Sequence, residues 1–543
     1  MMSQSFQGQI VDLWNKSIFP GEITINDGHI LDIKPMDING GPYILPGFID
    51  AHVHIESSML VPSEFARMAV IHGTVGTVSD PHEIANVLGV PGIEFMLDNA
   101  AKSALKIHFG APSCVPATTF ETAGAIIGVE EVKSLLERKD IWYLSEMMNY
   151  PGVLQGDQEV MAKIAASMSK HKPIDGHAPG LRGQDAKAYI EAGMTTDHEC
   201  YTYAEGREKA ELGMHIIIRE GSAAKNFEAL IPLIREFPDQ IMFCSDDKHP
   251  DDLMVGHINQ HVKRAIMAGF DLFQVLRAAC LNPVQHYKLP VGLLRVGDPA
   301  DFILVEDLKE FKVLATYING QQAAGNGMSY LESVAVENLN KFNCQPVTSE
   351  DLKIEAHGKH LKVIKVLDGQ LITETLEKPI KIKEGFMDSD PDDDVLKIVV
   401  INRYHSAPPA IGFIHGFGLK SGAIASCVAH DSHNIVAVGV DDDSLAQVIN
   451  EVIKNSGGIA ACSGNERKSI ALPIGGIMTG EDGPSVARNY AELDGWVKHE
   501  LKSTLKAPFM SLSFMALLVI PQLKMSDLGL FDGGKFSLTQ VSY

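Results

Sequence analysis

Eight short apolar segments recur between residues 44 and 290, and each ends in polar side chains. Stretches with helical periodicity separate them, for example residues 130–140 and 183–193. Segments that are apolar on both faces and alternate with helices are typical of a buried parallel sheet. Eight such units in about 240 residues predict a (β/α)8 TIM-like barrel, in which the carboxyl ends of the strands form the active-site face. The segments are 44–54, 73–83, 106–114, 141–146, 173–177, 194–199, 214–220 and 241–247.

Shorter strand-like segments flank the barrel on both sides. Residues 23–33 alternate around Asn26-Asp27-Gly28, which is a hairpin signal. A similar pattern returns at 297–308 and 313–321, so we expect one small β domain built from both flanks. The predicted domains are 1–43 with 291–345 for this unit, 44–290 for the barrel and 346–543 for a third, C-terminal unit.

The C-terminal unit is predicted to be an α/β domain. Residues 395–404 form an apolar strand-like run, and residues 388–394 are an acidic segment typical of a solvated linker. Residues 441–458 begin with Asp and end with Gly, as helices often do. The apolar residues of this helix recur at helical spacing at Leu445, Val448, Ile449, Val452 and Ile453.

The charge and the cysteines restrict the partners and the compartment. The net charge of −23 argues against nucleic acid or an anionic membrane as partner, because phosphate binding needs clustered Lys and Arg. Seven cysteines occur without any C-x-x-C, so we expect free thiols and a cytoplasmic location. No signal peptide is recognisable, and the longest apolar run, near 509–521, is shorter than the roughly 20 residues that span a bilayer.

The first barrel segment ends with two histidines that point the same way, because alternate residues of a strand share a face. A histidine pair alone is compatible with a structural role. The ends of the later segments add two histidines and two carboxylates, and such a set favours manganese, iron or zinc. Six groups exceed the three protein ligands of a typical catalytic zinc, so we predict two metals bridged by Glu146. The predicted ligands are His52, His54, Glu146, His177, His198 and Asp246.

These residues lie in longer motifs that resemble the adenine deaminases of the amidohydrolase superfamily. The motifs are PGFIDAHVHIESSM, DPHEIANVLG, PSCVP, EMMNYPGV, DGHAPGL, DHECY, IREGSAAKN, CSDDKHP, HDSHNIV and FMALLVIPQLKMSDLGLFDG. The resemblance covers nearly the whole chain, including a C-terminal unit that most amidohydrolases lack. Two mild departures are Leu518, where we expect proline, and a short N-terminus.

The resemblance implies metal-dependent hydrolysis of adenine to hypoxanthine and ammonia, as in purine salvage. It implies manganese, or alternatively iron or zinc, and it places Glu146 where many relatives carry a carboxylated lysine. We also expect a homo-oligomer, with a dimer favoured. In this chemistry water activated by metal attacks C6, Asp246 accepts a proton, and a second carboxyl serves N1. Glu83 is our first candidate for that carboxyl and Glu199 the second, although either can instead orient a ligand histidine.

Several further residues are candidates for substrate binding. Arg219, Glu220 and Ser222 follow the seventh strand and offer hydrogen bonds to a purine edge, and His82 and Cys114 lie at strand ends. His82 can alternatively support a ligand, and Cys114 can simply be a small buried residue. Residues 416–422 lack the spacing of a phosphate loop and are interpreted as a turn. Two questions stay open: whether His257 and His261 are surface or supporting groups, and whether residues 430–434 contact the barrel or form a polar turn.

Two other functions compete with this interpretation. An amidohydrolase acting on a cyclic amide or another aminopurine is the first, and the absence of a lysine at position 146 weighs against the cyclic-amide group. The second is a barrel that lost catalysis and serves as a scaffold, but such a chain would have lost some of the six ligands. Deaminases with the H-x-E and P-C-x-x-C signature are excluded by the missing C-x-x-C.

Overall fold

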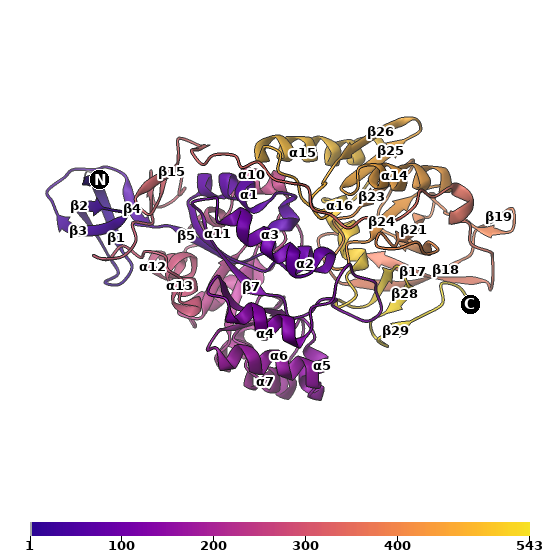
Figure 1. Cartoon of the computed structure of the whole chain (residues 1–543), viewed down its shortest axis with the longest axis horizontal. Helices are drawn as coiled ribbons and strands as arrows, with labels where there is room; N and C mark the ends of the chain where they lie inside the picture. Colours follow the sequence, from indigo (N-terminus) through magenta and orange to yellow (C-terminus); the bar gives the residue numbers. More distant parts are fainter. Residues whose placement is uncertain (1–2) are drawn as a thin grey trace.

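The computed structural model describes residues 3–543, which form three parts in a row (Figure 1). A small β domain lies at one end, the barrel is in the middle, and the C-terminal domain lies at the other end. Over the described range, no helix is both long enough and apolar enough to cross a membrane. The predicted fold class is confirmed by this arrangement.

The central barrel, within residues 3–543, has eight parallel strands in chain order. Its first and last strands meet through backbone hydrogen bonds: Asp246 N donates to His52 O at 3.0 Å, and His54 N donates to Asp246 O at 3.4 Å. This contact brings the ends of the two strands together. The strands are β5 Phe48–Val53, β6 Thr74–Ser79, β7 Lys106–Ala111, β8 Ile141–Met147, β9 Ile174–Gly176, β10 Thr196–Asp197, β11 His215–Arg219 and β12 Ile241–Cys244.

Helices surround the barrel, and the two helices predicted at 130–140 and 183–193 are present as α4 and α7. Val132, Leu135 and Leu136 of α4 are buried, as the apolar spacing predicts. The helices are α1 Pro62–Ala69, α2 His82–Leu88, α3 Val90–Ala100, α4 Val129–Glu137, α5 Tyr150–Gln155, α6 Gln158–Ser169, α7 Gly183–Glu191, α8 Tyr203–Glu211, α9 Phe227–Leu230, α10 Pro250–Val255, α11 Ile258–Met267, α12 Leu272–Leu276 and α13 Asn282–Tyr287.

The small β domain combines strands from both flanks of the barrel in one sheet, of order β16-β15-β14-β13-β4-β1-β2-β3. The predicted hairpin is β2 and β3, joined at Asp27-Gly28. The strands are β1 Gln4–Asp12, β2 Ser17–Asn26, β3 His29–Pro35, β4 Tyr43–Pro46, β13 Phe302–Val305, β14 Val313–Ile318, β15 Gln321–Gly325 and β16 Met328–Ser329.

The predicted first barrel segment, 44–54, is divided in the structure. Its residues 44–46 belong to β4 and pair with β1 and β13 in the small sheet, whereas the barrel strand begins at Phe48. Gly47 lies between them, where a Cβ would overlap the side chain of Val75. The chain therefore passes from one sheet to the other at the only residue type that fits this close approach. The exact domain boundaries stay a prediction.

The C-terminal domain is built on a sheet of order β18-β17-β22-β21-β24-β23-β25-β26. The predicted strand at 395–404 is β21, and the predicted helix is α14, which begins after Asp441. Asp441 caps the helix by accepting a hydrogen bond from Ser444 N at 2.7 Å. The elements are β17 His360–Val366, β18 Thr373–Pro379, β19 Ile382–Lys383, β20 Phe386–Met387, β21 Val395–Ile401, β22 Ala410–His415, β23 Ala423–Ser426, β24 Ile435–Gly439, α14 Asp442–Lys454, β25 Ile459–Ser463, β26 Glu466–Ile470, α15 Gly483–Glu500, α16 Pro508–Ser513, β27 Leu523–Ser526, β28 Gly529–Asp532 and β29 Ser537–Leu538.

The C-terminal domain is joined to the active-site face of the barrel by backbone hydrogen bonds. Thr479 N donates to Met59 O at 2.9 Å, and Val61 N donates to Thr479 O at 3.1 Å. Ala224 N, in the loop after β11, donates to Gly369 O at 3.1 Å. The face on which the strand ends converge is thus covered by the third domain.

Candidate metal centre

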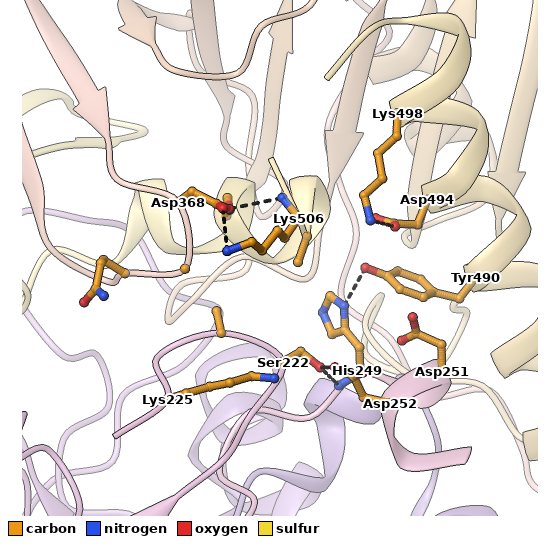
Figure 2. Close-up of a pocket in the computed structure, with 15 residues that line it drawn as sticks. Ser222, Lys225, His249, Asp251, Asp252, Asp368, Tyr490, Asp494, Lys498 and Lys506 are labelled. Carbon is orange, nitrogen blue, oxygen red and sulfur yellow. Dashed lines mark hydrogen bonds and ion pairs between the residues drawn. The ribbon is translucent and has the colours of Figure 1, made fainter. Parts of the chain in front are cut away.

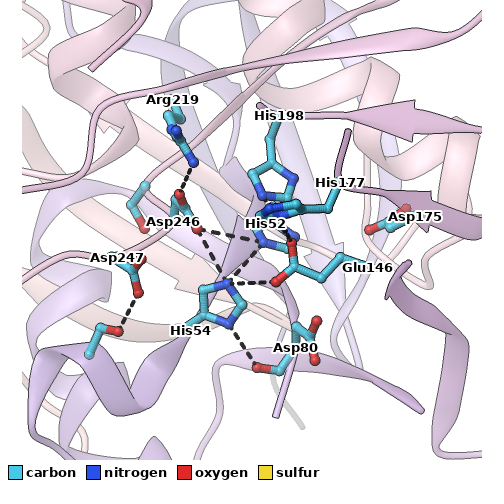
Figure 3. Close-up of polar contacts among 12 residues, drawn as sticks. His52, His54, Asp80, Glu146, Asp175, His177, His198, Arg219, Asp246 and Asp247 are labelled. Atoms are coloured by element: carbon cyan, nitrogen blue, oxygen red, sulfur yellow. Dashed lines mark hydrogen bonds and ion pairs between the residues drawn. The ribbon is translucent and has the colours of Figure 1, made fainter. Parts of the chain in front are cut away.

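The six predicted ligands lie together at the carboxyl ends of the barrel strands (Figure 3). All are buried, with at most 6% of any of them exposed. They fall into overlapping groups whose nitrogen and oxygen atoms lie within 4.8 Å of one another. Two of these ligands lie within strands, His52 in β5 and Glu146 in β8. The other four lie one or two residues after a strand: His54 after β5, His177 after β9, His198 after β10 and Asp246 after β12.

The first half of the cluster comes from the contact between β5 and β12. Nε2 of His52 lies 3.1 Å from Nε2 of His54, and Oδ1 of Asp246 lies 3.6 Å and 3.3 Å from these two atoms. On its other side, His54 Nδ1 lies 3.3 Å from the backbone oxygen of Asp80. A hydrogen bond donated there leaves the lone pair on Nε2, which is the form that binds a metal.

Glu146 connects this half to the second one. Its Oε1 lies 3.5 Å from His54 Nε2, while its Oε2 lies 2.7 Å from His177 Nδ1 and 3.1 Å from His198 Nε2. Burial alone would raise the pKa of Glu146, but the neighbouring His177 and His198 outweigh it and hold the pKa well below its usual range. One ionised carboxylate therefore faces both halves of the cluster.

The donor set fits divalent transition metals. Imidazole nitrogen and carboxylate oxygen together suit manganese, iron and zinc. Within the described chain, Nε2 of His177 and Nδ1 of His52 are buried without a hydrogen-bond partner. Burial opposes a charge on His198, yet the Glu146 carboxylate raises its pKa to about 9. The neighbouring His52 behaves differently, because burial, His198 and His54 hold its pKa well below the usual range.

Arg219 pairs with two carboxylates at the edge of the cluster. Its Nη1 and Nη2 contact the Glu199 carboxylate, with Nη2 donating to Oε2 at 3.0 Å, and Nη1 also donates to Asp246 Oδ2 at 2.7 Å. A bidentate pair of this kind fixes the orientation of both partners. Glu199 is therefore held by arginine, with His177 Nδ1 at 3.8 Å on its other side.

Glu83, the first residue after His82 in α2, contacts two histidines from the C-terminal domain. His430 Nδ1 lies against one carboxylate oxygen and His433 Nε2 against the other. Burial would raise the pKa of Glu83, but these imidazoles and His82 hold it well below its usual range. Burial alone would lower the pKa of His430, but the carboxylates of Asp247 and Glu83 outweigh it and raise this pKa to about 9. The open question about residues 430–434 is answered: this segment reaches into the barrel.

The remaining predicted substrate residues separate into two groups. His82 lines the cavity at the cluster, with Nδ1 3.2 Å from Asp80 Oδ2 and 3.5 Å from Glu146 Oε1. Three others lie outside that cavity. Glu220 pairs with Arg264 at 2.5 Å, Ser222 donates to Asp252 Oδ2 at 2.6 Å, and the Cys114 thiol lies against Met147 Sδ at 3.8 Å. Each is already engaged by a neighbour, and sequence position alone could not show this.

Two family models match the chain, one over the barrel that holds this cluster and one over the C-terminal domain. Residues 43–323 match the amidohydrolase family, and residues 370–537 match the adenine deaminase C-terminal domain. The adenine deaminase of a Sulfurovum species is 57% identical over 97% of both chains, and that of Salinibacter ruber is 54% identical over 98% of both. The adenine deaminase of Borreliella burgdorferi is 47% identical, again over 98% of both chains. This chain belongs to the adenine deaminase family.

Membership of the adenine deaminase family confirms the resemblance that the motifs indicate, including the match over the C-terminal domain. The structure adds site residues that the sequence analysis missed. Asp80 and Asp431 join candidate metal-binding groups with His82, and Asp247 accepts a hydrogen bond from Ser57 Oγ at 2.5 Å beside the cluster. Asp80 and Asp247 lie within the motifs DPHEIANVLG and CSDDKHP, so treating every polar residue at a strand end as a candidate would have found them.

The role of His257 was left open by the sequence. The structure shows that its side chain is buried and supports the metal-ligand cluster indirectly. Its Nε2 lies 2.7 Å from Asp50 Oδ2, and its Nδ1 lies 2.7 Å from Thr74 Oγ1. Asp50 also accepts a hydrogen bond from Ser245 N at 2.9 Å. This network joins β5 to the end of β12, directly beside His52 and Asp246, and so holds two strand ends in place.

Lys209 is predicted to anchor the second half of the cluster. Lys209 is buried in α8. Its Nζ donates hydrogen bonds to Asp197 Oδ2 at 2.7 Å, to Glu205 Oε1 at 2.9 Å and to the backbone oxygen of Ala178 at 2.7 Å. Lys209→Met leaves two buried carboxylates unpaired, so we expect the free energy of unfolding to fall by about 3–5 kcal/mol. Urea unfolding of the metal-loaded protein measures this.

The matched control for Lys209 is Lys187→Met. Lys187 lies on α7 with half of its side chain exposed, 3.7 Å from Glu191. An exposed pair contributes little, so the control should change stability by less than about 0.5 kcal/mol. Equal stability of both variants would show that the Lys209 network does not support the barrel.

Proposed function

We propose that this chain hydrolyses the amino group of adenine at C6, giving hypoxanthine and ammonia. One observation carries the proposal: a histidine and carboxylate cluster at the barrel rim adjoins Glu83, whose two histidine partners come from a domain matching the adenine deaminase C-terminal domain. Adenine deaminases at 47–57% identity over nearly the full length support the substrate.

The ligands of the metal are His52, His54, Glu146, His177, His198 and Asp246. Glu146 faces both halves of the cluster, which supports two cations per chain with this carboxylate between them. When bound, the cations supply the Lewis acidity that makes water a nucleophile near neutral pH. Manganese is the preferred ion, and iron or zinc is the alternative, because all three accept imidazole and carboxylate ligands.

Three carboxylates divide the remaining work. Asp246 is held by Arg219 beside His54, and it accepts the proton that water loses as the new C–O bond forms at C6. It then gives this proton to the amino group, which leaves as ammonia when the C–N bond breaks. Glu83 serves ring nitrogen N1, which gains a proton as the ring loses aromaticity. The protonated His430 beside Glu83 is the reservoir for that proton, since Glu83 itself is ionised. Glu199, paired with Arg219, orients the cluster.

Substrate contacts are assigned by the same geometry. His82 and Arg219 line the cavity at the cluster and are the substrate-facing candidates. The chain acts in purine salvage in the cytoplasm, where all seven cysteines of the described chain stay unpaired. Its partner is a second copy of itself in a homodimer.

Ammonia release from adenine tests the function. Protein stripped of metal should be inactive, and reloading with manganese, iron or zinc in turn should restore turnover, highest with manganese. Adenine should react and adenosine should not, because the similar relatives are named adenine deaminases and support the free base as substrate. Ammonia and hypoxanthine are measured together.

Two outcomes of this assay are informative in different ways. If the reloaded enzyme does not deaminate adenine but releases ammonia from another aminopurine, the proposed substrate would be wrong and the proposed reaction would stand. A reloaded enzyme inactive on every aminopurine would contradict the proposed function itself.

A further inference from the structure

The space left around the metal-ligand cluster is too small for adenine. The cavity lined by His54, Glu146 and Asp246 has a volume of about 30 Å³, enough for about two water molecules. Met148, Leu371 and Leu517 also line it. Met148 follows β8, whereas the two leucines come from the C-terminal domain. Apolar side chains from both domains therefore close the site, and a purine must pass them.

A much larger cavity, of about 500 Å³, lies on the other side of Met148. Met148 lines both spaces, and Leu518, next to Leu517, lines the larger one. Its walls come from the loop after β7, from Met148, Asn149 and helix α5 after β8, and from residues 518–536 of the C-terminal domain. Most of its lining is apolar, including Ala117, Pro151, Val519 and Phe536. We call this space the apolar antechamber.

A second large cavity of about 570 Å³ offers a different route (Figure 2). It lies between α10, α15 and the loop after β17, and it carries three lysines and four aspartates, among them Asp251 and Asp494. It shares no lining residue with the cavity at the cluster. The imidazole of His249, whose Nδ1 lies 2.6 Å from Tyr490 Oη, forms part of its wall. We call this space the charged cavity.

We propose that the apolar antechamber is the binding site from which adenine enters the catalytic cavity, with Met148 and Leu517 as its gate. The inference rests on the proposed function for the identity of the base. Adenine is a neutral, flat heterocycle at neutral pH, and its faces are desolvated more readily against apolar walls than against charged ones. An unbranched methionine changes rotamer readily, so Met148 can swing aside at low cost.

The same geometry explains how bulk solvent is kept away from the cluster. With the gate closed, the buried carboxylates and imidazoles interact in a space that holds about two water molecules, where their electrostatic interactions are stronger than in bulk water. Adenine in the apolar antechamber reaches the cluster when the side chains of Met148 and Leu517 move aside. The antechamber thus holds the base next to the reaction site.

Filling each cavity in turn tests the route. Val519→Trp fills the apolar antechamber, and Ala507→Trp fills the charged cavity; both positions are half-buried and lie in the C-terminal domain. We expect Val519→Trp to lower kcat/KM for adenine at least about tenfold, because association is slowed. Its kcat and its metal content should change far less. Ala507→Trp should keep kcat/KM within about twofold.

A second filling variant protects the test against a folding defect. Ala117→Phe fills the apolar antechamber from the barrel side, and it should reproduce the loss of kcat/KM with an unchanged melting temperature. Loss of kcat/KM in Ala507→Trp alone would overturn the proposal in favour of the charged cavity. Unchanged kcat/KM in both antechamber variants would overturn it as well. Failure of the wild-type enzyme to deaminate adenine is a separate result, which contradicts the proposed function instead.

Discussion

Replacing Glu146 with glutamine is expected to lower adenine turnover at least about 100-fold and to reduce bound metal from about two ions per chain toward one. The amide keeps the shape of the side chain but removes the negative charge that faces His54, His177 and His198. Two cations bound close together would repel each other, and the negative charge of Glu146 would offset that repulsion. Metal analysis by mass spectrometry and steady-state kinetics on the same preparation measure both effects.

The matched control for this variant is Glu137→Gln. Glu137 lies at the end of α4 with most of its side chain exposed, near Lys170 at 3.4 Å. It should keep full metal content and full turnover. If Glu146→Gln also retained two metals and full activity, Glu146 would not be a ligand, and the second half of the cluster would need another bridge.

Glu83→Gln is expected to lower turnover at least about 100-fold with metal content unchanged, the lower range for loss of a general acid or base. The amide cannot carry a proton between His430 and ring nitrogen N1. Glu83 is not among the six ligand candidates, and its oxygens contact His430 and His433. Turnover and bound metal are therefore expected to separate in this variant.

Two further variants sharpen the assignment of Glu83. Glu199→Gln should lose less than about 10–100-fold, mostly through metal affinity, because Glu199 is paired with Arg219. His433→Ala should lower turnover through Glu83 while leaving the metal in place. If Glu199→Gln were inactive with its metal retained while Glu83→Gln stayed active, the two carboxylates would have exchanged roles.

The barrel could be predicted because its pattern is local. Each strand carries its own apolar run and its own polar terminus, so the eight segments and the convergence of their ends follow without knowledge of distant contacts. The junction at Gly47 could not be predicted from the sequence. The division of residues 44–54 between two sheets depends on contacts with Val75 and with strands β1 and β13, which are distant in the chain. A continuous apolar segment has the same sequence pattern whether it belongs to one sheet or is divided between two.

The candidate site shows the same limit. The two-residue spacing of His52 and His54 is visible in the sequence, but Glu83 lies 347 and 350 residues from His430 and His433. The spacing of apolar residues along the sequence does not indicate which residues of two different domains are in contact. For the same reason the sequence could not show that Glu220 is engaged by Arg264 or that Ser222 is engaged by Asp252. Their motif is close to the rim, while their side chains turn away from it.

The contact between Glu83 and the two distant histidines restricts how a gene for this enzyme can change. A frameshift after codon 345 would leave a barrel in which Glu83 keeps His82 as a neighbour but loses both of its C-terminal imidazole partners. Transfer of the last two hundred codons from a remote relative would succeed only where the donor preserves both histidines and the backbone that aims them. Natural selection therefore acts on the two halves as one heritable unit, and their histories of substitution should be correlated at these positions.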